Sequence, residues 1–127
     1  MVHVTDQQFQ QLIDDAMGTL PAQHMARLQN VAILYAEEPS PEQRKTLQLR
    51  HDQTLFGLYE GVPLPQRQGM TRVLPDKITL FKLPLCASVD TEAALREQIR
   101  HTLWHEVAHY FGLDHDRIHE LERPDTV

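Results

Sequence analysis

Among its 127 residues the chain has a single cysteine, Cys86, so it cannot form an internal disulfide and nothing points to an oxidising compartment. A free cysteine is usually a small buried residue, and we expect Cys86 in the core. The first eleven residues are polar and do not form a secretory signal, and no apolar run is long enough to span a bilayer. We therefore expect a cytoplasmic protein.

Basic residues are also scarce. The sequence has 12 lysines and arginines against 18 aspartates and glutamates, which gives a formal net charge of -6. Nucleic acids and anionic membranes favour basic surfaces, so the charge argues against both as partners. The hydrophobic fraction of 41% and the charged fraction of 24% are normal for a globular protein. A chain of this length can bury one core, and we expect one domain over residues 1–127.

The spacing of apolar residues predicts a helix near each end of the sequence. At the N-terminal end, Thr5 and Gln8 can form a capping box for a helix that ends near Gly18 and Pro21. Its apolar face consists of Phe9, Leu12, Ile13 and Ala16. The longest predicted helix covers residues 91–111, and its predicted core side consists of Ile99, Leu103, Val107, Tyr110 and Phe111.

Between these helices the sequence predicts strands and short helices. Strands are expected at residues 31–35, 55–62 and 77–83, and Pro84 marks the last of these as a strand end or a sheet edge. Short helices are expected at residues 22–28, 41–49 and 114–121, and a loop at 63–69. This order favours a small sheet packed against helices, in an α/β or α+β domain.

The long helix carries side chains with metal-binding chemistry. His105 and His109 are four residues apart, so they lie on one helix face and each can offer a ring nitrogen to the same ion. Glu106 is turned by roughly 100° from His105 and flanks the pair, where it can act as general base beside a zinc-bound water. His101 stands one turn earlier, as a supporting group or as an ordinary histidine.

A third ligand is expected just beyond the helix. Gly112 can adopt the left-handed conformation that ends a helix, and the turn would bring His115 back towards the metal. Asp114 and Asp116 are oxygen donors that could take its place. Three neutral nitrogen ligands with one position open for water are the pattern of a catalytic zinc site. We therefore predict one zinc ion held by His105, His109 and His115, with Glu106 as the catalytic base.

Residues 105–115 match the extended motif of the metzincin peptidases, His-Glu-x-x-His-x-x-Gly-x-x-His. The whole chain resembles the small bacterial zincin-like metallopeptidases, also called minimal zincins, and residues 57–64 and 75–81 resemble further stretches of that family. The resemblance implies an α+β zincin core with a small mixed sheet, an active-site helix and one zinc ion.

The sequence departs from the larger metzincins after the third ligand. Those enzymes have a methionine-containing turn there, whereas this chain has methionines only upstream, at positions 1, 17, 25 and 70. The motif does not identify the residue that stabilises the oxyanion, for which Tyr59 and Arg117 are candidates.

Three functions are compatible with these residues. The first is a zinc peptidase acting on peptides or unfolded proteins, which would lie extended along an edge strand, with residues 77–83 as the candidate edge. The second is a zinc-dependent endoribonuclease, a group with similarly spaced histidines that typically lacks the equivalent of Glu106. The third is a non-catalytic, zinc-stabilised adaptor, which would need a fourth ligand. Glu106 and the acidic charge favour the peptidase.

Overall fold

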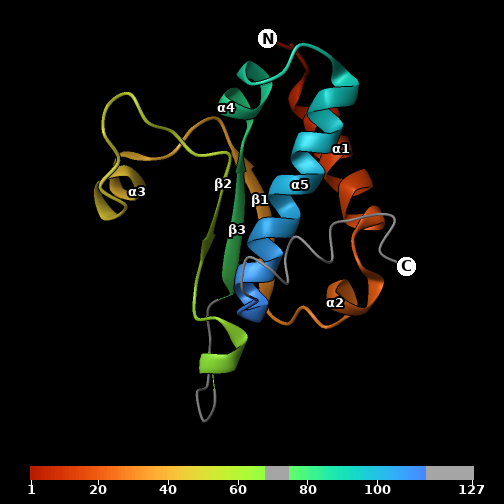
Figure 1. Cartoon of the computed structure of the whole chain (residues 1–127), viewed down its shortest axis with the longest axis vertical. Helices are drawn as coiled ribbons and strands as arrows, with labels where there is room; N and C mark the ends of the chain where they lie inside the picture. Colours follow the sequence, from red (N-terminus) through yellow and green to blue (C-terminus); the bar gives the residue numbers. More distant parts are fainter. Residues whose placement is uncertain (68–74, 114–127) are drawn as a thin grey trace.

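The computed structural model describes residues 1–67 and 75–113, in which a small sheet is covered on one side by two long helices (Figure 1). In chain order the elements are α1 (Asp6–Thr19), α2 (Ala22–Ala26), β1 (Val31–Ala36), α3 (Pro41–Thr46), β2 (Gly57–Glu60), the 3-10 helix η1 (Leu64–Gln66), β3 (Asp76–Phe81), α4 (Lys82–Ala87) and α5 (Glu92–Phe111). The helix predicted at 114–121 lies outside the described residues.

The sheet is mixed and has the strand order β1-β3-β2. β1 pairs with β3 in parallel, and β2 pairs with β3 in the antiparallel direction. This confirms the α+β class with a small mixed sheet. All residues of β3 except Lys77 are buried, so side chains on both faces of this strand are covered.

The prediction of residues 77–83 as an edge strand was wrong. β3 is the central strand and ends at Phe81, after which the chain continues as α4. Pro84 lies in the first turn of α4, where a proline is tolerated because its missing N–H has no intrahelical partner. Among the described strands, β1 and β2 lie at the two edges of the sheet, and α5 contacts the edge strand β2.

The core lies between the sheet, α1 and α5. The predicted capping box of α1 is present, with Thr5 Oγ1 accepting from the Gln8 amide at 3.1 Å and the Gln8 side chain accepting from the Thr5 amide at 2.8 Å. The predicted apolar faces are buried as expected, together with Trp104 and Cys86, except that Phe111 is only partly buried. No helix in the described ranges is both long and apolar enough to cross a membrane.

Candidate active site

α5 begins and ends as the sequence predicts, and it positions the histidine motif. Thr91 caps its first turn by accepting from the Ala94 amide at 3.1 Å. At the other end Gly112 has a φ of 71°, the left-handed conformation in which glycine has no steric cost. Between these ends the helix is regular, so His105 and His109 are separated by about one turn.

The strand β2 passes close to the motif because residue 57 is a glycine. A Cβ atom at Gly57 would lie 2.7 Å from Thr102 Cγ2 and 3.4 Å from Glu106 Cγ. The backbone of β2 therefore lies against the helix face that carries Glu106. A glycine inside a predicted strand is itself a signal of such a close approach, although we predicted only a strand there.

Glu106 and His109 contact each other. The distance from His109 Nδ1 to Glu106 Oε1 is 3.1 Å, and the side chain of Glu106 is only 12% exposed whereas that of His109 is 50% exposed. When the imidazole donates from Nδ1, its other nitrogen, Nε2, is the one left to bind a metal. The hydrogen bond with Glu106 raises the pKa of His109, and partial burial opposes this effect.

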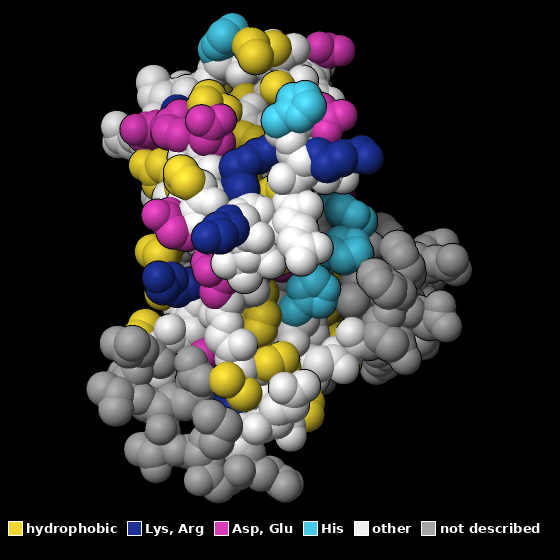
Figure 2. Space-filling model, turned by 90° about the vertical axis from the view of Figure 1, so that its left-hand side faces the viewer, with side chains coloured by type: hydrophobic (Ala, Val, Ile, Leu, Met, Phe, Trp, Pro, Cys, Tyr) yellow, Lys and Arg dark blue, Asp and Glu magenta, His cyan; other side chains and the backbone are white. Residues whose placement is uncertain are grey.

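The first turn of the motif faces an open hollow of about 320 Å³. His105 and Glu106 line it from α5, and Phe56 and Gly57 line it from the start of β2. His101 lies in the same hollow, with its ring centroid 4.4 Å from that of His105. Figure 2 shows histidine side chains gathered on one face of the molecule. His101 thus contacts a predicted ligand directly.

The donor set of the described residues fits zinc in part. Two imidazoles on one helix face, beside a mostly buried carboxylate and an open hollow, are suitable partners for this ion. The described ranges contain no group of three or more histidine, cysteine, aspartate or glutamate residues that could hold a metal. The predicted third ligand His115 and its alternatives Asp114 and Asp116 lie outside those ranges, so the third ligand stays a prediction.

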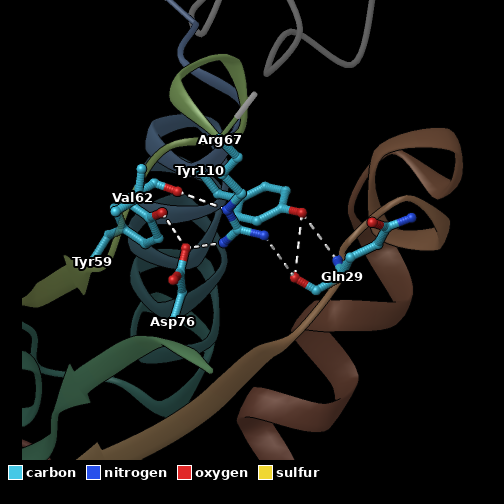
Figure 3. Close-up of polar contacts among 6 residues, drawn as sticks. All are labelled: Gln29, Tyr59, Val62, Arg67, Asp76 and Tyr110. Atoms are coloured by element: carbon cyan, nitrogen blue, oxygen red, sulfur yellow. Dashed lines mark hydrogen bonds and ion pairs between the residues drawn. The ribbon is translucent and has the colours of Figure 1, made fainter. Parts of the chain in front are cut away.

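A second polar cluster lies beside the end of α5 and involves Tyr59, one of the two candidates for the oxyanion-stabilising residue (Figure 3). The Tyr59 hydroxyl donates to the buried carboxylate of Asp76, which also pairs with Arg67. Burial and the Asp76 carboxylate raise the pKa of Tyr59, so the phenol stays protonated and remains a donor to Asp76. The other candidate, Arg117, lies outside the described residues.

Comparison with known proteins agrees with the geometry of α5. No curated protein matches the chain. The sequence model of one family, described as zincin-like metallopeptidase, matches residues 28–124, a range that includes the whole sheet, α5 and the predicted ligands. Since the match covers most of the chain, the protein belongs to the zincin-like metallopeptidase family.

Proposed function

We propose that the protein is a zinc-dependent peptide hydrolase in which His105, His109 and His115 hold one zinc ion and Glu106 is the general base. The observation that supports this most directly is the burial of Glu106 beside His109 and next to β2. A glutamate on a solvated helix face would be exposed and would not be enclosed by a strand.

Zinc, when bound, supplies a Lewis acid that polarises the scissile carbonyl and makes water a stronger acid. Glu106 accepts a proton from the attacking water and passes it to the leaving amine. Its contact with His109 holds the carboxylate at the helix face, and β2 lies against the stem of the Glu106 side chain at Gly57. Both contacts reduce the freedom of the base before substrate binds.

We infer that the substrate is an extended peptide or an unfolded protein segment that lies beside β2. This strand is at the sheet edge and its first residue, Gly57, lines the hollow in front of His105. An edge strand can pair its backbone with an extended chain. The hollow is open, so it offers few side-chain pockets, and we expect slow cleavage with weak sequence preference.

The endoribonuclease is less well supported, because Glu106 has no role in it and the net charge of -6 opposes an RNA partner. The adaptor is also less well supported, because a closed zinc site needs four protein ligands and we propose only three.

The experiment is cleavage of a peptide library by the zinc-loaded protein, compared with the variant Glu106→Gln. This change keeps the size of the side chain and removes its basic oxygen, so bound zinc should remain while hydrolysis falls by at least about 100-fold. The matched control is Glu97→Gln on the same helix, where the side chain is 68% exposed and pairs with Arg100. Cleavage by Glu106→Gln at the parent rate would remove Glu106 as the base.

A further inference from the structure

Arg67 joins three parts of the chain, of which the one at Gln29 is distant in the sequence. Its Nε donates to the carbonyl oxygen of Val62 at 2.8 Å, and one terminal nitrogen donates to the carbonyl oxygen of Gln29 at 3.3 Å. The other terminal nitrogen pairs with the carboxylate of Asp76, which is fully buried at the start of β3. All three guanidinium nitrogens are therefore engaged, and the side chain is only 14% exposed (Figure 3).

The same guanidinium packs on the last turn of α5. Its carbon Cζ lies 4.8 Å from the centroid of the Tyr110 ring, a distance at which a cation and an aromatic face attract. Tyr110 is fully buried, and its hydroxyl accepts from the Gln29 amide at 3.1 Å. Arg67 and Tyr110 thus share Gln29 as a partner, so a shift of one side chain would disturb the other.

A second contact fixes the same turn. A Cβ atom at Gly112 would lie 2.9 Å from Cγ of Pro65, so the segment that carries Pro65 and Arg67 lies directly against the end of the helix. The last residues of an isolated helix fray, because their carbonyl groups have no intrahelical donors. Here the segment from Val62 to Arg67 holds them from outside.

We propose that Arg67, oriented by Asp76, is a positioning residue for the metal site. It fixes Tyr110, and Tyr110 directly follows His109, so Arg67 sets the position from which His109 reaches the metal. Metal ligands must be held to within about 0.5 Å, which a fraying last turn would not do. The proposal rests on the zinc site proposed above. The alternative is that the cluster stabilises the fold and leaves the metal site unaffected.

The test compares the full-length parent with Arg67→Lys, which keeps the charge but cannot make the three directed hydrogen bonds of the guanidinium. Arg50→Lys is the matched control, since the Arg50 side chain is 73% exposed. Three quantities are measured at a temperature where every variant is folded. They are the zinc Kd by competition with a chelator, the visible absorption of the Co²⁺-loaded protein, and amide hydrogen exchange along α5.

We expect Arg67→Lys to raise the zinc Kd about tenfold, as is common when a group that orients a metal ligand is replaced. The Co²⁺ bands should shift, and amide exchange should accelerate in the last turn of α5 but not in its middle, from Leu95 to Leu103. Arg50→Lys should leave all three quantities unchanged. An unchanged Kd and unchanged Co²⁺ spectrum, even with a lower melting temperature, would overturn the proposal and leave Arg67 a purely structural role.

Two further outcomes are decided by the same measurements. If Arg67→Lys does not fold, Tyr110→Phe replaces it, because this change keeps the ring and removes only the hydroxyl contact with Gln29. If the parent binds no zinc, the proposed function fails, but hydrogen exchange still shows whether Arg67 fixes the last turn. Exchange that accelerates uniformly along α5, or not at all, would then overturn the positioning role.

Discussion

Replacing Gly57 with alanine tests the close approach of β2 to α5. The new Cβ atom would lie 2.7 Å from Thr102 Cγ2 and 3.2 Å from Leu80 Cδ2, and the first distance is too short for two carbon atoms. Thr102 and Leu80 are both buried, so neither side chain can move into solvent. Overpacking of this kind costs about 1–3 kcal/mol of unfolding free energy. For a domain of this size, we expect the melting temperature to fall by roughly 4 °C per kcal/mol.

The reason for the loss can be checked with a second substitution. Thr102→Ser removes Cγ2, the atom in the shortest contact, and keeps the hydroxyl that accepts from Gln98 at 3.3 Å. Alone it should cost about 1 kcal/mol for the lost methyl group. Combined with Gly57→Ala it should restore stability, because the new Cβ fills the space that the methyl leaves. The double variant should therefore be at least about 1 kcal/mol more stable than the sum of the single effects predicts.

Thermal and urea unfolding of the four proteins in this cycle measure the coupling. Gly18→Ala is the control, because no atom lies within 4 Å of a Cβ at that position in α1. It should be neutral or stabilise the helix by up to about 1 kcal/mol. If Gly57→Ala proves as harmless as Gly18→Ala, or if the two effects simply add, the strand does not lie against the helix as described.

Three further predictions concern the metal and the substrate. His105→Ala or His109→Ala should abolish zinc binding and the stabilisation that zinc provides, about 2.7 kcal/mol at a zinc concentration 100 times the Kd. Metal analysis and thermal melting with and without a chelator measure both effects. A parent protein that is purified without metal, and whose stability does not change when zinc is added, would argue against the site. His115→Ala should weaken zinc binding, measured by competition with a chelator, far more than Asp114→Ala or Asp116→Ala. If one of the aspartate variants loses more affinity than His115→Ala, that aspartate and not His115 is the third ligand. Denatured proteins and short peptides should be cleaved faster than a matched folded protein, and rapid single-site cleavage of the folded protein, seen by gel electrophoresis, would contradict an open site.

Features that depend on neighbouring residues could be predicted from the sequence. The capping box of Thr5 and Gln8 involves residues three apart, and the end of α5 depends on a single glycine, Gly112. The helical face that carries His105, Glu106 and His109 follows from the period of the helix alone. The predicted start of α3 at Pro41 was also correct. The helix ends at Thr46, before the predicted end at residue 49, because Gln48 adopts a left-handed conformation that few residues other than glycine favour.

Features that depend on distant residues could not be predicted in this way. No local pattern in the sequence shows that the Asp76 carboxylate is fully buried or that Tyr59 and Arg67 both bind it. The close approach at Gly57 is visible as a glycine in a strand, but its partner Thr102 can be named only once β2 is placed against α5.

The position of β3 shows why this difference matters for function. An apolar strand that ends near a proline has the same local sequence whether it lies at the centre of a sheet or at its edge, because the order of strands is set by pairing between distant segments. Once β1 and β2 pair with its two sides, β3 has no backbone groups to offer a substrate. The same pairing places Gly57 opposite Leu80 and leaves β2 at the edge, beside the hollow in front of His105 and Glu106. The strand proposed to bind substrate therefore also lies against Glu106, the proposed base, so a substrate paired with β2 would be held next to that carboxylate.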